Sequence, residues 1–483
     1  MSIRLLDIVK PFVSILPELE FPYEKLGFDD KILYTVGPAA LYMLSSLPIN
    51  GVNPAKLADP FGWLRIPFAS QQGTLLEFGL LPIITAGLFW QFLAGSKLIK
   101  VNFEARSDRE LFQSLQKFTT YILALVYATV LVFAGYFQPI DSVASDSTTS
   151  IWTNLLIIAQ LTGFSIISSL MIEVMDKGYG FGPGISAIIA LSASAKFAQS
   201  AIGPTSYVTS RGYESDGAIV QTVRNFFSKS FGHAVVESFT RADGANLLQV
   251  YIALIAIAVS VYLSNIRLDV PIKSSKVRSM ASVYPVKLIY CGALPLLFTY
   301  AVLYNVNIFG FALTKICNTC PQISLIGKWE LDAFTKQSYN LVGGFLYFIS
   351  SSSSSKCFIG SLIRPFTYGA FVVGISTLFS SKWINYSGSS GRDLAKQFKE
   401  QDISMLGHRD ATKELNRIIP TAAIIGAVIT SSLVAVTENL CSTGLCVGSV
   451  VGIFSALTVL ESVMTEWQQT GGVGSQLSAV FNP

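Results

Sequence analysis

The most informative stretch of this 483-residue sequence runs from Leu57 to Thr85 and reads LADPFGWLRIPFASQQGTLLEFGLLPIIT. Its first part belongs to a segment, residues 52–73, that mixes apolar side chains with Pro54, Pro60, Gly62 and Pro67. This segment is too short and too broken to cross a membrane. The apolar side chains are Phe61, Trp63, Leu64, Ile66 and Phe68. This part is either an external loop packed on the protein or a short re-entrant piece, which is permitted only where protein or water covers its backbone.

The broken stretch leads directly into an apolar segment, residues 74–95, and the composition of the whole chain is of the same kind. Hydrophobic residues make up 51% of the chain and charged residues only 13%, whereas soluble domains carry about 25% charged residues. A soluble enzyme, a disordered chain and a secreted disulfide scaffold are therefore excluded. The two histidines and six cysteines form no visible zinc cluster, and we expect neither a metal nor a cofactor. We expect an all-α polytopic membrane protein.

Ten segments are apolar enough to span a bilayer, which requires about 20 residues each. They are residues 31–49, 74–95, 116–137, 151–172, 184–203, 246–265, 286–313, 361–385, 418–437 and 445–464. A further apolar piece, Leu341–Ile349, is too short and is expected to re-enter the membrane or to pack under the bundle. Residues 1–30 and 465–483 form the termini, and Ser2–Lys10 is expected to lie on the membrane as an amphipathic helix or to be a solvated tail.

A polar segment, residues 204–245, divides the spans into an N-terminal half, residues 31–203, and a C-terminal half, residues 246–464. Because each half has five spans, the second starts on the opposite side of the membrane, an arrangement that permits inverted pseudo-symmetry. The loops on one side hold about twice as many Lys and Arg residues as those on the other. The positive-inside rule therefore predicts that both termini are cytoplasmic, which makes the sequon at Asn385 cytoplasmic and unused.

Two basic loops on the predicted cytoplasmic side are candidate binding sites. The loop between spans six and seven includes Lys273, Lys276 and Arg278, and the loop between spans eight and nine includes Arg392, Lys396 and Lys399. Such loops could bind anionic lipid headgroups or nucleic-acid phosphates, or could reflect positive-inside bias alone.

The predicted spans carry almost no carboxylates near the middle of the membrane. Glu77, Glu173 and Glu461 lie near predicted span ends, and ion-coupled carriers usually place acidic residues deeper. The glycine-rich stretch Lys177–Gly184 lacks the Gly-Lys-Ser/Thr of a phosphate loop and is interpreted as a turn. Five cysteines fall on the non-cytoplasmic side, where some could pair, but the sequence leaves the pairing open. They are Cys317, Cys320, Cys357, Cys441 and Cys446.

Several stretches taken together resemble the Sec translocon pore subunit family, which comprises bacterial SecY and its eukaryotic α-subunit counterparts. The resemblance covers nearly the whole chain in order, and its details are most similar to the second, auxiliary pore subunit of yeasts. It is carried by GTLLEFG at residues 73–79, PIIT at 82–85, DRELFQ at 108–113, KGYG at 177–180, PIKSSKVR at 271–278, SGSS at 387–390 and RDLAKQFK at 392–399.

This resemblance implies ten helices in two pseudo-symmetric five-helix halves around an hourglass pore. It also implies that residues 57–71 are a plug that closes the pore. Six apolar side chains should form a constriction ring, with Phe454 or Leu457 as alternatives to the small Ala456 at its last position. The implied ring residues are Leu80, Ile84, Ile185, Ile189, Leu297 and Ala456. Leu80 and Ile84, like Ile185 and Ile189, are four residues apart and so share a helix face.

The resemblance also implies a lateral gate between spans two and three on one side and spans seven and eight on the other. A small polar cluster in this gate maps to Thr85, Asn305 and position 127, where the tyrosine departs from the family pattern. The two basic loops match the ribosome-docking loops of the family. Gly391 stands where a proline is expected before Arg392, so we expect a flexible turn there.

The expected function is that of a passive protein-conducting channel in the endoplasmic reticulum membrane, not an enzyme. The implied partners are the translating ribosome, nascent chains with their signal sequences, membrane lipid, and small β- and γ-type subunits. The alternative function is a ten-span transporter of small solutes, which requires a polar site near the middle of the membrane.

Overall fold

The computed structural model describes residues 10–13, 16–24, 26–53, 57–99, 101–102, 105–137, 147–209, 212–241, 244–274, 281–317, 324–331, 339–351, 358–400, 403–405, 411–441 and 443–469. The part of the N-terminus predicted to lie on the membrane falls almost entirely outside this range. Only the short helix α1, Lys10–Val13, is described there.

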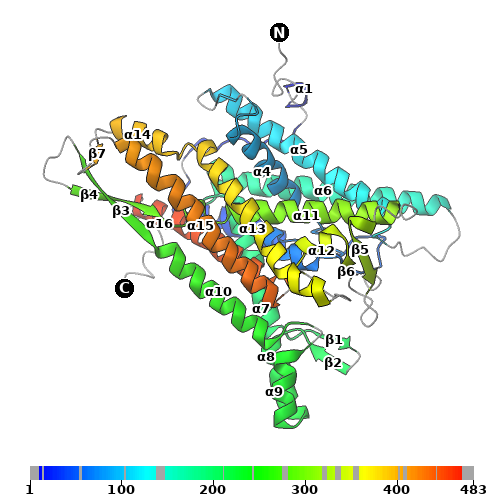
Figure 1. Ribbon diagram of the computed structural model, residues 1–483. Coiled ribbons are helices and arrows are strands. Elements are labelled where there is room, and N and C mark those ends of the chain that lie inside the picture. Colours follow the sequence, from blue (N-terminus) through cyan, green and yellow to red (C-terminus); the bar gives the residue numbers. More distant parts are fainter. Residues whose placement is uncertain are drawn as a thin grey trace.

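Ten long helices form the bundle in the described residues, in the order that the hydropathy predicts (Figure 1). The N-terminal half has α2 (Phe28–Leu44), α4 (Leu81–Gly95), α5 (Arg106–Phe133), α6 (Ser147–Val174) and α7 (Gly184–Ile202). The C-terminal half has α10 (Leu247–Asn265), α11 (Leu294–Ile316), α13 (Phe358–Tyr386), α15 (Ala411–Cys441) and α16 (Leu445–Gln469). Eight of them are long and apolar enough to cross a membrane, and α2 and α4 are shorter, with 17 and 15 residues.

Two predicted spans begin well before the helices that the structure shows. Helix α4 begins at Leu81 rather than at residue 74, because residues 71–80 form successive turns instead of helix. Helix α11 begins at Leu294 rather than at residue 286, because the preceding residues form a strand that runs to Lys287. Both segments are apolar, and hydropathy alone does not distinguish a helical turn from other buried backbone.

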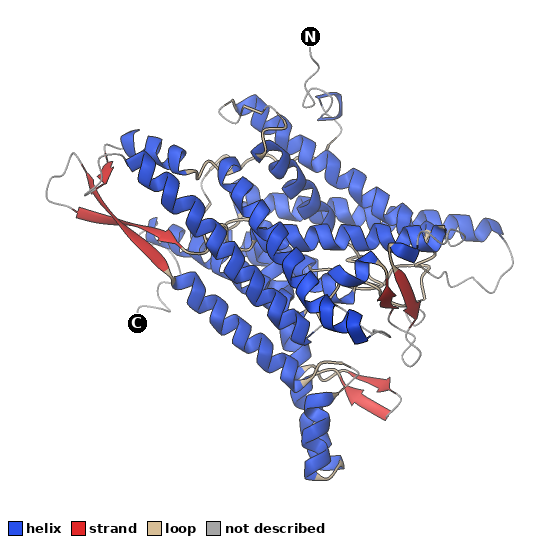
Figure 2. Cartoon of the chain, in the orientation of Figure 1, coloured by secondary structure: helices blue, strands red, loops and turns tan. Residues whose placement is uncertain are grey.

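In the described part of the chain, seven short strands lie between the helices of the bundle (Figure 2), and the sequence analysis predicted none of them. Strands β3 (Arg267–Ser274), β4 (Ala281–Lys287) and β7 (Ile403–Met405) form one antiparallel sheet in the order β4-β3-β7. The hairpins are β1 (Ser206–Thr209) with β2 (Gly212–Ser215), and β5 (Lys328–Leu331) with β6 (Tyr339–Gly343).

Several short helices lie between the long helices in the sequence. The segment between α7 and α10 holds β1, β2 and two helices, α8 (Ala218–Ser228) and α9 (Phe231–Thr240). Helix α14 (Gly391–Glu400) lies between α13 and α15. The apolar piece Leu341–Ile349 is divided between β6 and helix α12 (Phe345–Ile349), which packs against α13.

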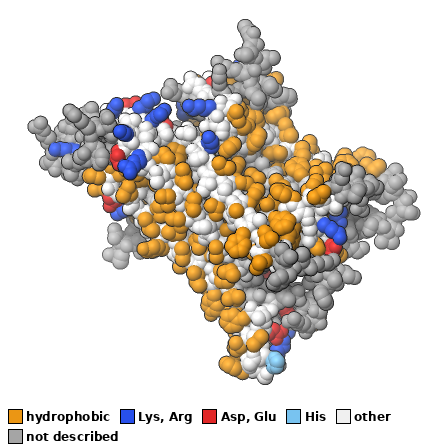
Figure 3. Space-filling model, viewed as in Figure 1, with side chains coloured by type: hydrophobic (Ala, Val, Ile, Leu, Met, Phe, Trp, Pro, Cys, Tyr) orange, Lys and Arg blue, Asp and Glu red, His pale blue; other side chains and the backbone are white. Residues whose placement is uncertain are grey.

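The two halves meet along two seams. Helix α7 packs along α16 on one side, and α4 and α5 pack against α11, with α4 also against α13, on the other. One large cluster of buried apolar side chains lies between the halves and draws residues from both. Apolar side chains also cover much of the outer face of the bundle in Figure 3, as expected for a surface that faces lipid.

Candidate functional site

The broken stretch after α2 is folded into the middle of the bundle. It forms a short helix, α3 (Gly62–Arg65), and a single 3-10 turn, η3 (Ile66–Phe68). The side chains of Phe61, Trp63, Leu64 and Phe68 are buried, and Ile66 is partly buried. The structure does not show an external loop: protein encloses the segment, which is the condition stated for a re-entrant piece. We call it the central segment, residues 57–71.

Aromatic rings fasten the central segment to the C-terminal half. The ring of Phe61 lies 5.6 Å from that of Tyr304 and 5.7 Å from that of Phe311, both on α11. Phe68 also contacts Tyr304, at 5.6 Å between ring centroids. Trp63 meets Tyr368 of α13 edge to face, at 6.3 Å. Such aromatic pairs each contribute about 0.5–1.5 kcal/mol beyond the burial of area.

Glycines provide the space in which this segment lies. A Cβ atom on Gly444, before α16, would lie 2.2 Å from the carbonyl oxygen of Trp63, and one on Gly448 would lie 2.1 Å from Cγ2 of Ile66. On the opposite side, Gly79 has φ +52°, and a Cβ there would lie 2.3 Å from the carbonyl oxygen of Phe68. A side chain at any of these positions would displace the central segment.

A buried group of charges holds the same segment to the start of α4. Arg65 is only 5% exposed and Glu77 only 2%. The Arg65 guanidinium lies 2.5 Å from a carboxylate oxygen of Asp59 and 2.5 Å from one of Glu77, and it donates a hydrogen bond of 3.1 Å to the Tyr136 hydroxyl. Burial by itself would lower the pKa of Arg65, but the two carboxylates raise that pKa well above its usual value. Arg65 is therefore charged and paired.

The other oxygen of Glu77 accepts a hydrogen bond of 2.6 Å from the backbone N–H of Gly73. Both carboxylate oxygens of Glu77 thus have partners, as a buried charge requires. The sequence analysis placed Glu77 at a span end and assigned no role to Arg65. The sequence did contain one signal for this ion pair. An arginine within a short apolar stretch needs a partner of opposite charge when it is buried.

The predicted ring residues come together beside the central segment. Leu80, Ile84, Ile189 and Leu297 are buried members of the central apolar cluster, and Ile185 packs against it. At the last position the structure favours Phe454, which belongs to this cluster, and Leu457, which packs on it, whereas Ala456 does neither. Phe454 and Leu457 are three residues apart and so share a helix face, but Ala456 points to another side of α16.

Two cavities are lined in part by predicted ring residues. One, of about 410 Å³, is lined by Ile185, Leu297, Phe454 and Leu457, and reaches Lys287 and Glu461. The other, of about 320 Å³, is also lined by Ile185 and reaches Lys117 and Glu173, whose side chains lie 2.6 Å apart. Each cavity therefore extends from apolar side chains that include predicted ring residues to oppositely charged side chains.

The predicted gate residues form a hydrogen-bonded chain across the α4/α5–α11 seam. The Tyr127 hydroxyl of α5 donates to Oδ1 of Asn305 on α11. The Nδ2 of Asn305 donates in turn to Oγ1 of Thr85 on α4, at 3.1 Å. Tyr127 is fully buried. The tyrosine that departs from the family pattern thus takes part in the same polar cluster.

The two basic loops join into one surface at one end of the bundle. Strand β7 pairs with β3, with Ser404 opposite Lys273, and Phe398 of α14 packs on Tyr284 of β4 at 5.4 Å between rings. Arg392, Lys396 and Lys399 are exposed on one face of α14, while Leu394, Ala395 and Phe398 are buried on the other. Lys276 and Arg278 lie outside the described residues. Figure 3 shows cationic side chains gathered at this end.

Gly391, where the sequence predicts a flexible turn, is the first residue of α14 and is buried. A Cβ atom on this residue would lie 2.5 Å from the backbone nitrogen of Asn416. The glycine therefore permits a close approach of α14 to α15, which the Cβ of a proline would block. The flexibility of the turn stays a prediction.

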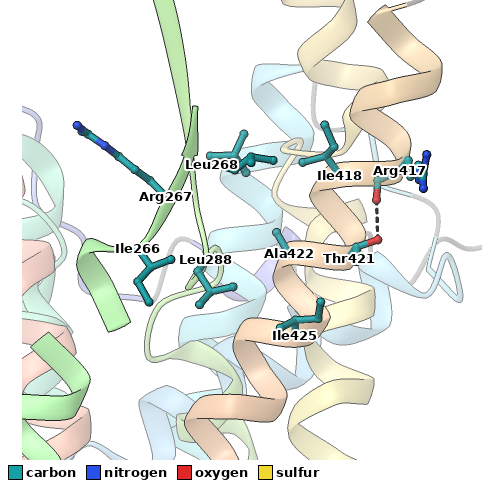
Figure 4. Close-up of a pocket in the computed structure, with 10 residues that line it drawn as sticks. Ile266, Arg267, Leu268, Leu288, Arg417, Ile418, Thr421, Ala422 and Ile425 are labelled. Carbon is teal, nitrogen blue, oxygen red and sulfur yellow. Dashed lines mark hydrogen bonds between the residues drawn. The ribbon is translucent and has the colours of Figure 1, made fainter. Parts of the chain in front are cut away.

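Beside this basic surface, an apolar hollow of about 390 Å³ separates the base of the β3–β4 hairpin from α15 (Figure 4). Ile266, Leu268, Leu288, Ile418, Ala422 and Ile425 line it. The side chains of Arg267 and Arg417 extend away from it, and Thr421 donates to the carbonyl of Arg417 at 2.6 Å. It contains no group suited to chemistry, and among the described residues there is no metal-binding group of acids, histidines and cysteines.

The structure also brings together two of the cysteines whose pairing the sequence left open. The Sγ atoms of Cys441 and Cys446 lie 2.7 Å apart at the turn between α15 and α16. Cys317, Cys441 and Cys446 are free thiols in the structure, and Cys320 and Cys357 lie outside the described residues.

Comparisons with known proteins agree with this architecture. Residues 74–466 match the SecY family, and residues 41–73 match the plug domain of Sec61p. The chain is 37% identical to the protein transport protein SEC61 subunit alpha of Yarrowia lipolytica, over 95% of this chain and 96% of that protein. It is 36% identical to the Sec sixty-one protein homolog of Saccharomyces cerevisiae, over 97% of this chain and 96% of that protein.

A solved structure supports the same fold. The chain in an idle yeast Ssh1 complex bound to the yeast 80S ribosome is 33% identical to this one, with a TM-score of 0.78. The match covers 98% of this chain and 97% of that chain.

Proposed function

This chain belongs to the SecY family, and on that premise we propose that it is the pore subunit of a protein-conducting channel in the endoplasmic reticulum membrane. It passes nascent polypeptides across the membrane and releases hydrophobic segments sideways into lipid. The observation that carries the proposal is the central segment, which lies on an apolar ring between two five-helix halves. A solute transporter is not favoured, because the ring offers no polar site for a solute.

In the proposed closed state, the ring and the central segment act as two barriers in series. An apolar constriction sheds water and so blocks ions, while its flexible side chains can fit around a passing peptide. The central segment is the plug, and it moves aside when a chain enters. The hollow lined by Ile185, Leu297, Phe454 and Leu457 receives the chain before it meets the ring.

Sideways release uses the seam that Tyr127, Asn305 and Thr85 hold closed. A signal sequence that enters this seam gains about 25 cal/mol for each Å² of apolar surface it removes from water. The gate opens when this gain exceeds the cost of separating the hydrogen-bonded side chains, which is about 1–3 kcal/mol for each buried group left unpaired.

We propose that the basic surface docks a ribosome, since a similar chain lies in an idle yeast Ssh1 complex bound to the yeast 80S ribosome. The exposed cations of α14 suit ribosomal RNA phosphates, and binding should weaken steeply with salt. This end and both termini are cytoplasmic under the positive-inside rule. The translating ribosome supplies the driving force, and small β- and γ-type subunits complete the channel.

Site-specific crosslinking from a stalled nascent chain tests this function. Photoreactive residues at Ile84 and Leu297 should crosslink to the mature part of the chain, and one at Tyr127 should crosslink to its signal sequence. Tyr262, which is exposed on the outer face of α10, is the control and should crosslink to neither. Ribosome binding without crosslinks at Ile84 and Leu297 would exclude conduction through this pore.

A further inference from the structure

The helical hairpin α8–α9 projects from the end of the bundle that is opposite the basic surface (Figure 1). It joins α7 to α10 and therefore links the two halves. The α8 helix contacts the ends of both α7 and α10, and α9 contacts α8 and α10. Neither the proposed conduction path nor the proposed docking surface uses this hairpin.

The hairpin is held in a defined orientation at its base. Arg241, after α9, forms a buried ion pair of 3.0 Å with Glu214 of β2, and it also donates to the carbonyl of Ser215 at 2.8 Å. The side chain of Gln221 on α8 accepts a 2.8 Å hydrogen bond from the backbone N–H of Ser215. The direction in which the outer faces of α8 and α9 point is thus set by the fold.

The outer faces are strongly apolar. Phe227 is 89% exposed and Phe231 is 76% exposed, and the Phe226 and Phe231 rings lie 5.6 Å apart where the two helices meet. Further exposed apolar side chains follow the helical repeat on the same faces, at Ile219, Val223, Val236 and Phe239. Charged and polar side chains occupy the remaining surface, at Arg224, Lys229, His233 and Glu237. In water, so large an apolar patch would mark an interaction surface.

This apolar face continues a surface that already faces lipid. The neighbouring outer side of α10 exposes Leu248, Tyr251, Leu254 and Ile255. Figure 3 shows the hydrophobic surface extending over the projecting hairpin, with the charged side chains and the histidine on its other side. A protein partner on the hairpin alone would not account for this continuity with the face of a membrane span.

We propose that α8–α9 lies in the bilayer interface opposite the basic surface, with its phenylalanine face inserted among the acyl chains. Amphipathic helices bind membranes in this way when a large apolar face is set against a charged one. The inserted hairpin anchors the link between the two halves to one leaflet. This proposal requires only that the bundle spans a membrane, so it does not depend on conduction or on ribosome binding.

The experiment uses the full-length chain with its small subunits, reconstituted in phospholipid vesicles. A variant with Phe227→Cys, labelled with the environment-sensitive fluorophore NBD, reports the apolar face. The matched control is His233→Cys, which lies on the exposed polar face of α9, and the labelled unsubstituted chain gives the background from native cysteines. Since both side chains are exposed, neither change disturbs the packing of the hairpin.

Doxyl-labelled lipid should quench the probe at position 227 several-fold more than the probe at 233, and aqueous iodide should show the reverse order. Equal access of iodide to both probes would overturn the proposal, because the hairpin would then lie in water. A probe at 227 protected from iodide and from doxyl lipid alike would also overturn it, since a protein surface would cover the face. As a control for labelling, the Phe227→Cys and His233→Cys variants should incorporate NBD with equal yield in detergent micelles without doxyl lipid.

Discussion

The plug segment and the seam that we propose as the lateral gate both contain buried polar groups, but of different kinds. Arg65 in the plug is paired with the carboxylates of Asp59 and Glu77. The gate is closed by neutral groups, the hydroxyls of Tyr127 and Thr85 and the amide of Asn305. Removing one partner from a buried ion pair costs about 3–5 kcal/mol, while removing one partner from a buried neutral hydrogen bond costs about 1–3 kcal/mol.

This difference suggests a division of labour between the two closures. A plug held by charges stays seated until a chain pushes it aside, which suits a barrier against ions. A gate held by neutral groups has a small free-energy difference between its closed and open states. It can therefore respond to small differences in the hydrophobicity of a signal sequence.

The largest effect is expected from Arg65→Met. The substitution leaves the carboxylates of Asp59 and Glu77 buried without a counter-charge, at a cost of about 3–5 kcal/mol, so the plug should leave its seat. Ion conductance of the reconstituted channel should rise strongly, as measured in planar bilayers. A triple variant that also carries Asp59→Asn and Glu77→Gln should restore much of the seal. A conductance that stays at the level of the unsubstituted chain would refute the ionic latch.

A smaller effect on the same closure is expected from Gly448→Ala. The new methyl group would meet Cγ2 of Ile66, and overpacking of this kind costs about 1–3 kcal/mol. The control is Gly374→Ala in α13, where a Cβ atom meets nothing within 4 Å. Conductance should rise for Gly448→Ala and not for Gly374→Ala. Equal conductance of the two variants would show that the plug does not rest against α16.

Tyr127→Phe should act on the gate and leave the plug closed. It removes one hydrogen bond to Asn305, which changes the gate equilibrium by about 1 kcal/mol, or roughly five-fold. Weakly hydrophobic signal sequences should then be integrated more efficiently in a translocation assay, with unchanged ion conductance. The control is Tyr262→Phe on the outer face of α10. If conductance rose together with integration, the two closures would be coupled and the distinction between them would fail.

The smallest effect on either closure is expected from Arg392→Glu, which lies on the docking surface. Ribosome binding should weaken, and its dependence on salt should become shallower, because a phosphate contact is lost. Arg224→Glu at the opposite end of the molecule is the matched charge reversal and should leave binding unchanged. Sedimentation with ribosomes at several salt concentrations measures both. Unaltered binding of the Arg392→Glu variant at moderate salt would remove α14 from the docking surface.

Local composition was sufficient to predict the helices of the bundle and the broken segment between the first two. Hydropathy over about 20 residues reports whether a segment can lie in lipid, and proline and glycine report where it cannot continue as a helix. These are properties of neighbouring residues, so they can be read along the chain. The starts of α4 and α11 were misplaced because an apolar turn or strand has the same hydropathy as an apolar helix.

Contacts between residues that are far apart in the sequence depend on the tertiary packing. Nothing near Arg65 in the sequence indicates that it would share a site with Tyr136, 71 residues away. Likewise, only the orientation of α16 places Phe454 rather than Ala456 against the ring, and only the approach of α14 to α15 explains Gly391. Arg65, Phe454 and Gly391 are buried, so protein takes the place of water around them. Their positions therefore depend on which surfaces of the protein meet, and only the tertiary structure gives that information.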